Sequence, residues 1–140
     1  MPVMQHKEDG FTMIEMMVVL VIISVLVGGG VKFYSGYIGK AKIDKARADI
    51  STMQAVVEGF YAENSFYPGD SDAASLASLG LNTDLVGTYG GEVKNYMYDQ
   101  LSDGSSYKLY TGKPVDGTYY VVGVGTGGSS AKAITQQTSP

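Results

Sequence analysis

A single carboxylate stands inside the longest apolar stretch of the chain. Between Phe11 and Val31 the only formally charged residue is Glu15, and a carboxylate in lipid is strongly unfavourable unless it is neutralised or paired. A cut between Gly10 and Phe11 would create an α-amine about one helical turn from this carboxylate. In a helical stack of copies, Glu15 of one subunit could pair with the Phe11 amine of another and so fix the axial register of the stack.

The chain contains few other residues that could form a catalytic or ligand-binding site. The chain has no cysteine, which excludes a disulfide framework, a thiolate zinc site and a cysteine nucleophile. Its one histidine, His6, precedes the apolar stretch, so histidine triads and histidine-bound metals lose support. Lys and Arg total 10 against 14 Asp and Glu, without the basic stripe that neutralises phosphates. These absences predict that the chain is not an enzyme and does not bind nucleic acid directly.

The segment GVGTGG, residues 123–128, formally matches the G-x-G-x-x-G pattern of dinucleotide-binding loops. That pattern needs a strand–helix–strand unit and a later acidic residue for the ribose. The short sequence after Gly128 contains no acidic residue. We therefore interpret this segment as a glycine-rich strand end.

The elements that would position Glu15 begin with a long helix. At about 1.5 Å per residue, a helix over residues 11–31 spans roughly 30 Å, enough to cross a bilayer. Over residues 32–64, apolar residues recur at spacings of three and four, which is typical of an amphipathic helix. Because no proline occurs between Phe11 and Tyr67, we predict one helix from Phe11 to about Glu63. Its apolar stripe consists of Ile43, Ala46, Ile50, Met53, Val57 and Phe60.

Three consecutive glycines, Gly28, Gly29 and Gly30, fall within the predicted helix. Each is about 1 kcal/mol less favourable than alanine in a helix interior. They predict either a segment that unwinds and stretches when subunits pack, or close approach of neighbouring helices in the membrane. Both interpretations stay open.

The sequence after the helix is rich in glycine and tyrosine, which predicts turns and strands. A short helix over residues 73–81 would be closed by Gly80. Strands over 96–101, 106–112 and 118–125 would form an antiparallel meander, followed by a tail that is loose or an edge segment. The expected fold is α+β, with the long N-terminal helix packed on a small three- to four-stranded antiparallel sheet.

These elements divide the chain into a leader (1–10), a membrane-spanning half-helix (11–31), an amphipathic half-helix (32–64) and a globular head (65–140). A secretory signal peptide cut near Gly30 is a simpler interpretation and would release a soluble domain. However, the apolar run is long for a signal peptide and the leader is not clearly basic. A plain anchor is the other alternative, in which the chain is a monomeric membrane-anchored extracytoplasmic binding module whose tyrosine-rich strands contact a ligand.

The segment GFTMIE, residues 10–15, followed by the apolar run, resembles the class III signal of type IV pilins and of the pseudopilins of type II secretion. The segment KARADISTMQAVVEGFYAENSFYP, residues 45–68, is similar to the helix end of major pseudopilins and related pilins. The resemblance implies that prepilin peptidase cuts after Gly10 and N-methylates Phe11, and that Glu15 is the assembly glutamate.

The resemblance further implies a homo-oligomeric helical filament, a pilus (fimbrium) or a secretion pseudopilus. Its expected partners are prepilin peptidase, an assembly ATPase, a platform protein and minor pilins. Before assembly the chain would be a single-pass protein of the cytoplasmic (inner) membrane, and the filament would lie at the cell surface or in the periplasm. The sequence does not separate a pilus from a secretion pseudopilus or a competence pilus.

The sequence departs from the family pattern in three ways. Many Gram-negative type IV pilins close a C-terminal loop with a disulfide, and this chain has no cysteine. The family often has a proline in the middle of the N-terminal helix, where this chain has glycines. Major pseudopilins often bind calcium in C-terminal loops, for which Asp99, Asp103 and Asp116 are weak candidates here. Solvated turn aspartates are the favoured interpretation, so no cofactor is predicted.

Overall fold

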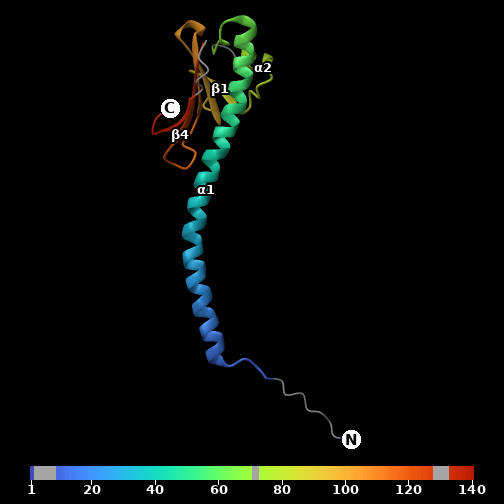
Figure 1. Cartoon of the computed structure of the whole chain (residues 1–140), viewed down its shortest axis with the longest axis vertical. Coiled ribbons are helices and arrows are strands. Elements are labelled where there is room, and N and C mark those ends of the chain that lie inside the picture. Colours follow the sequence, from blue (N-terminus) through green and yellow to red (C-terminus); the bar gives the residue numbers. More distant parts are fainter. Residues whose placement is uncertain (2–8, 71–72, 128–132) are drawn as a thin grey trace. The chain divides into compact units, whose positions relative to one another are not determined.

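The computed structural model describes residues 1, 9–70, 73–127 and 133–140. Its contacts divide the chain into two compact units, Met1–Ile38 and Gly39–Pro140. Most of the predicted leader, including His6, lies outside the described residues. The elements follow one another as α1 (Met13–Asn64), α2 (Ala73–Ser78), β1 (Val86–Thr88), β2 (Tyr96–Leu101), η1 (Ser102–Gly104), β3 (Ser106–Thr111), β4 (Tyr120–Thr126) and β5 (Ala133–Gln137) (Figure 1).

The predicted long helix is confirmed as α1, which remains helical through the three glycines. It ends at Asn64 because Ser65 adopts a left-handed conformation with φ 63°. In this position the Ser65 N–H donates to the Tyr61 carbonyl at 2.8 Å, the single bond of an αL helix cap. The Asn64 side chain also donates to the carbonyl of Phe60 at 3.0 Å, which adds a second hydrogen bond at the helix end.

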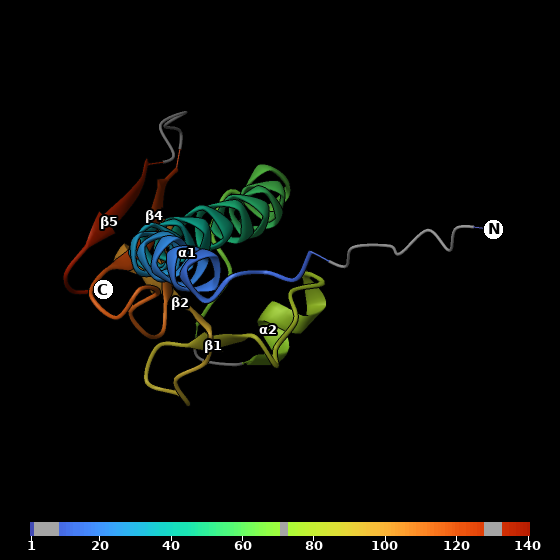
Figure 2. The ribbon, with the colours of Figure 1, turned by 90° about the horizontal axis from the view of Figure 1, so that it is seen from below.

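A five-stranded sheet forms the second unit together with the C-terminal half of α1. The spatial order is β1-β2-β3-β4-β5. Strand β1 runs parallel to β2, and the other three pairings are antiparallel. This half of α1 lies against one face of the sheet (Figure 2).

The α+β fold with a long helix packed on a sheet is confirmed, and the three predicted strands correspond to β2, β3 and β4. The sheet has two further strands at its edges. Strand β1, with the sequence VGT, is too short to show an alternating pattern. Strand β5 comes from the tail that was expected to be loose or an edge segment, and its residues are mainly polar because it is an edge strand.

The short helix α2 ends as predicted at a glycine. Gly80 has φ 81°, its N–H donates to the Ala77 carbonyl, and the Leu81 N–H donates to the Leu76 carbonyl. These two bonds define a Schellman motif, in which glycine takes the left-handed position without strain. Leu76 and Leu81 are both buried, so this turn places apolar side chains in the core of the second unit.

The core joins the stripe of α1 to the inner face of the sheet. Four of the six predicted stripe residues are buried: Ile43, Ala46, Ile50 and Val57. Met53 and Phe60 are only half-buried, and Gln54 is buried in a position that the apolar pattern did not predict. On the sheet side the core contains Tyr98, Tyr107, Leu109 and Val121.

The glycine-rich end of β4 makes this packing possible. Gly123 lies opposite α1, where an added Cβ would stand 2.7 Å from the Ile50 side chain. At Gly125 the space is taken by the Tyr107 ring, and at Gly127 by the Tyr61 ring. The glycines at alternate positions therefore make room on one face of the strand, which is a packing role rather than dinucleotide binding. The last glycine of the GVGTGG segment, Gly128, lies outside the described residues.

Candidate functional site: the N-terminal segment

The bond predicted to be cut lies in exposed, non-helical chain. Residues Gly10, Phe11 and Thr12 precede the first turn of α1, and nothing lies within 4 Å of a Cβ built at Gly10. The Phe11 side chain is 82% exposed. A peptidase that binds an extended segment can therefore reach the Gly10–Phe11 peptide bond without unwinding a helix.

Glu15 caps the helix in its own chain. The Thr12 N–H donates to the Glu15 carboxylate at 2.9 Å, and the Glu15 N–H donates to the Thr12 hydroxyl at 3.3 Å. This reciprocal pair is a capping box, which satisfies two of the N–H groups that a helix start leaves open. The carboxylate also lies at the positive end of the helix dipole, where a negative charge is favoured.

Thr12 is a functional candidate that the sequence analysis missed. Its signature was present in the sequence, since Thr-x-x-Glu directly before an apolar run is a capping box. The box lies entirely after the Gly10–Phe11 bond. A cut at that bond would therefore leave both residues of the box in the remaining chain.

The first half of α1 has an almost fully exposed apolar surface. Its most apolar 18-residue window has a mean hydropathy of 2.5 and is 0% buried. By length and composition this is a helix that can cross a membrane, although a signal sequence meets the same criteria. One face of the helix, directly beside Glu15, carries Ile14, Met17, Val18, Val21 and Ile22. Such a surface needs either lipid or other helices to cover it.

Three consecutive glycines leave part of this helix surface without side chains. Gly28, Gly29 and Gly30 are helical, and nothing lies within 4 Å of a Cβ built at any of them. Their open sides suit close approach of another helix. Their low helix propensity equally suits local unwinding. Close helix approach and local unwinding therefore both remain predictions.

The three weak calcium candidates sit in separate local environments. Asp116 accepts hydrogen bonds from the N–H groups of Thr118 and Tyr119, and these bonds lower the pKa of its carboxyl group. Asp103 lies in η1 with φ 53°, a turn conformation that aspartate tolerates. Across the described ranges, no group of three or more His, Cys, Asp or Glu residues could hold a metal ion. These residues therefore stay weak candidates, and solvated turn aspartates remain the favoured interpretation.

Asp99 is buried on β2 beside a second carboxyl group. Burial and a hydrogen bond with Asp70 raise the pKa of Asp99, while Lys108 on the neighbouring strand lowers it. The Asp70 carboxylate also accepts the Gln100 N–H at 3.1 Å. The pair ties the segment after α1 to the sheet, which is a structural use of these side chains.

Comparison with known proteins finds a described sequence motif in the N-terminal segment and relatives among the pilins. Residues 5–31 match the family model described as the prokaryotic N-terminal methylation motif. The chain is 29% identical over 91 residues to the type IV major pilin protein PilE of Neisseria gonorrhoeae, covering 65% of this chain and 53% of that protein. The chain thus carries this motif and is similar in sequence to a type IV pilin.

Two further relatives come from both branches of this group. A fimbrial protein of Neisseria meningitidis serogroup A is 30% identical over 94 residues, covering 66% of this chain and 54% of that protein. The type II secretion system core protein G of Dickeya chrysanthemi is 37% identical over 65 residues, covering 46% of this chain and 42% of that protein. The pilin-like chain thus spans about half the length of the curated relatives it matches. No solved structure matches it.

A tyrosine cluster secures the end of α1 on the head of this pilin-like protein. The hydroxyl groups of Tyr67 and Tyr107 donate to the Glu58 carboxylate at 3.1 Å and 3.3 Å. The Tyr67 ring stacks on Tyr61 at a centroid distance of 4.5 Å and meets Tyr107 edge-on at 4.6 Å. Burial, reinforced by Glu58, raises the pKa of Tyr67 to about 12. The Tyr67 hydroxyl therefore stays protonated at physiological pH and serves as a donor.

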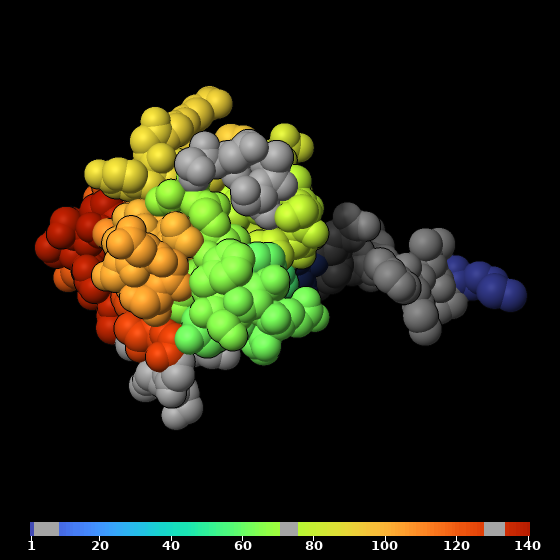
Figure 3. Space-filling model, turned by 90° about the horizontal axis from the view of Figure 1, so that it is seen from above, coloured from blue at the N-terminus to red at the C-terminus, as the bar shows by residue number. Residues whose placement is uncertain are grey.

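The same cluster joins the helix end to the turn between β2 and β3. Figure 3 shows the end of α1 in green beside this turn in orange. The Tyr67 N–H donates to the Gly104 carbonyl at 2.9 Å, and the buried Tyr98 hydroxyl donates to the Pro68 carbonyl at 2.8 Å. The head is therefore fixed to the second half of the helix by hydrogen bonds as well as by apolar packing.

Proposed function

We propose that this chain is the structural subunit of a type IV pilus or of a related type II secretion pseudopilus, polymerised through its N-terminal helix. The observation that carries the proposal is the exposed apolar half of α1 with one carboxylate at its start. The methylation-motif match over residues 5–31 and the pilin and pseudopilin relatives support it.

Processing is the first step of the proposed pathway. A prepilin peptidase cuts the exposed bond between Gly10 and Phe11 and N-methylates Phe11. The cut removes the polar leader and leaves a cationic α-amine at Phe11, four residues before Glu15. Because the box lies wholly within the mature chain, the helix start keeps its cap after cleavage.

Assembly then exchanges the partner of Glu15. In the isolated chain its carboxylate accepts the Thr12 N–H of the same chain. In the filament it pairs with the Phe11 amine of a neighbouring subunit, which neutralises two charges within an apolar core. An axial offset of even one turn leaves both charges unpaired, so the pair selects one register.

The remaining components act around this subunit. We propose a single-pass precursor in the cytoplasmic membrane, extracted by an assembly ATPase and a platform protein, with minor pilins in the finished filament at the cell surface or in the periplasm. The chain itself is proposed to have no catalytic role and to need no cofactor.

The N-terminal mass of the protein from its native membrane, or from sheared surface material, tests the proposal. A mature chain that begins at methylated Phe11 is the expected result. A chain that begins at Met1 would support the monomeric anchored module instead. A chain that begins after Gly30 would support a secreted domain, and either result would overturn the role given to Glu15.

A further inference from the structure

A groove of about 460 Å³ lies within the second unit, along the side of α1. Its apolar walls come from α1 and from the segment that leads from α2 into β1: Met53, Val56, Leu81, Leu85 and Val86. The Leu85 side chain is 43% exposed, so the groove is open to solvent. A concave apolar surface of this size can accept an aromatic side chain from another molecule.

The same unit carries exposed apolar side chains that could fill such a groove. Outside the groove, the large ones among the described residues are Phe66, Tyr89, Val93 and Tyr119. Tyr89 and Val93 belong to a loop with one carboxylate and one lysine, and so does Tyr119, so both loops are neutral. Phe66 differs because the residues around it carry only negative charge.

Phe66 lies in a surface that we call the acidic tip, formed by residues 58–70 and 102–107. A backbone hydrogen bond joins the two segments, and Figure 3 shows the end of α1 beside the turn that follows β2. The tip contains no lysine or arginine. Its carboxylates are Glu58, Glu63, Asp70 and Asp103. The Phe66 ring meets Phe60 edge-on at 5.5 Å and is still 50% exposed.

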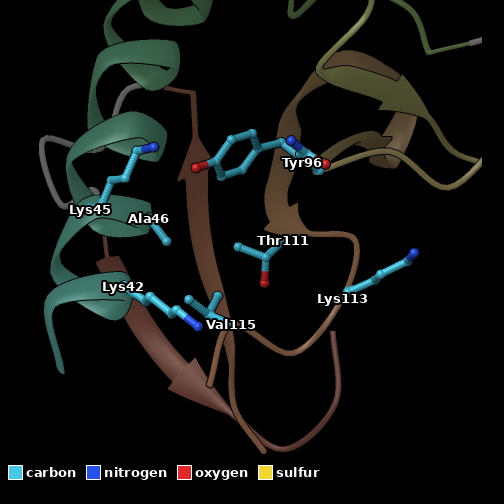
Figure 4. Close-up of a pocket in the computed structure, with 8 residues that line it drawn as sticks. Lys42, Lys45, Ala46, Tyr96, Thr111, Lys113 and Val115 are labelled. Carbon is cyan, nitrogen blue, oxygen red and sulfur yellow. The ribbon is translucent and has the colours of Figure 1, made fainter. Parts of the chain in front are cut away.

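The part of α1 that leads into the groove has the opposite charge. Residues 39–49 contain four cations against two carboxylates. Lys45 lines the groove, and Figure 4 shows Lys42 and Lys45 directed from α1 toward the strands, whereas Lys113 points away from them. Asp49 also lines the groove, and its carboxylate accepts a tyrosine hydroxyl at 2.5 Å. Lys45 forms no ion pair within the described residues.

We propose that the acidic tip of one copy docks on the groove of a second copy, with Phe66 inside the groove and Glu63 beside Lys45. The inference rests on the filament proposed above and assigns one contact between the heads of its subunits. Glu63 is exposed and, like Lys45, has no ion-pair partner in the described part of its own chain. An aromatic side chain in an apolar pocket, with opposite charges at the rim, is a typical protein interface.

The acidic tip and the groove are different surfaces of one head. Phe66 follows the end of α1, whereas the groove lies along the helix between Lys45 and Val56. One copy can therefore offer its tip to one neighbour and its groove to another. Contacts between unlike surfaces continue from copy to copy, so they build an open helical assembly rather than a two-fold dimer.

Introduced cysteines can detect this contact because the chain has none of its own. Thr52→Cys places a thiol at the groove and Ala62→Cys places one at the acidic tip, both at exposed positions. The full chain with both substitutions is treated with a short bismaleimide in sheared filaments and, separately, in concentrated detergent micelles. We expect a ladder of dimers, trimers and longer products, whereas either cysteine alone should leave monomers.

The matched control pairs Thr52→Cys with Thr118→Cys, which is exposed and lies outside both surfaces. This pair should give no ladder. Charge reversal then tests the ion pair in the chain that carries Thr52→Cys and Ala62→Cys. Glu63→Lys or Lys45→Glu should each slow cross-linking about fivefold, because repulsion replaces attraction. The two reversals together should restore the rate, which a merely structural effect of either substitution would not do.

Four results would overturn the proposed contact. Filaments in which Thr52→Cys and Ala62→Cys give no ladder would exclude the contact and leave the filament proposal standing. An equal ladder from the Thr118→Cys control would show crowding rather than a site. Dimers from Thr52→Cys alone would assign the groove to a two-fold contact. A double reversal no faster than the single reversals would refute the pairing of Glu63 with Lys45.

The N-terminal mass tests the filament proposal without reference to this contact. If no filament is recovered, the reaction in micelles still decides the contact. A ladder there would support head-to-tail docking, and its absence would overturn it.

Discussion

Replacing Glu15 by glutamine separates its capping role from its proposed pairing with a neighbouring subunit. The isolated chain uses Glu15 as the acceptor of a capping box, and glutamine can occupy the same position because its amide oxygen accepts the same N–H. Glutamine cannot neutralise the Phe11 amine of a neighbouring subunit. Glu15→Gln therefore keeps the helix start and removes only the charge.

Glu15→Gln is expected to weaken subunit addition strongly. Removing one partner of a buried charge pair is unfavourable by about 3–5 kcal/mol, which is roughly two to four orders of magnitude in the equilibrium constant for adding a subunit. Thr12→Val is the reciprocal change, because it removes the capping hydroxyl and retains the carboxylate. Loss of a cap is typically unfavourable by about 1 kcal/mol, so Thr12→Val should lower filament yield by less than tenfold.

The assay measures the fraction of the chain recovered in sheared filaments for the wild type and the two variants. The N-terminal mass of each variant shows whether cleavage after Gly10 is intact. Glu15→Gln should be cleaved normally and should yield almost no filament. Normal filament yield from Glu15→Gln would refute the charge pair. A loss in Thr12→Val as complete as that in Glu15→Gln would assign the effect to the helix start instead.

Two further predictions concern the head, and urea unfolding of the full chain in detergent micelles, followed by tyrosine circular dichroism, measures both. Gly125→Ala should lower the free energy of unfolding by about 1–3 kcal/mol, because the new methyl group overlaps the Tyr107 ring. The control is Gly59→Ala, at an open helical position, which should raise the free energy of unfolding by about 0.5–1 kcal/mol. Equal effects of the two substitutions would contradict the packing role of Gly125. The pKa of Asp99 is raised above 3.8 in the folded chain, so stability should fall as the pH rises from 3.8 through that folded value, and Asp99→Asn should remove this part of the slope. An unchanged pH dependence in Asp99→Asn would refute the buried carboxyl pair.

The long helix and the central strands were predictable because their patterns are local. Apolar residues without proline define α1, and alternation with good turns defines β2, β3 and β4. Strand β1 was not predictable, since its three residues are held by pairing with β2 and carry no pattern of their own. A strand this short can be identified only from its pairing with a neighbouring strand in the structure.

The side chains around the helix show a similar limit. Periodicity identified Ile50 and Val57 as core residues, but it could not show that Gln54 lies buried between them. That burial follows from Gly123 on β4, where the missing side chain leaves room for the Gln54 amide. The Thr-x-x-Glu pattern in the sequence predicts the capping role of Glu15. Because Glu15 lies inside an apolar run, the sequence analysis interpreted it as part of a charge pair instead.

The sheet order has a consequence for how the head folds. Strands β2 to β5 pair only with their neighbours in sequence, so three of the four pairings form by successive hairpins. Contacts of such short sequence separation favour rapid folding, whereas the docking of α1 joins residues far apart in the chain. For example, the bond between Tyr107 and Glu58 spans 49 residues. We therefore expect the hairpins to form first and the helix to complete the head last.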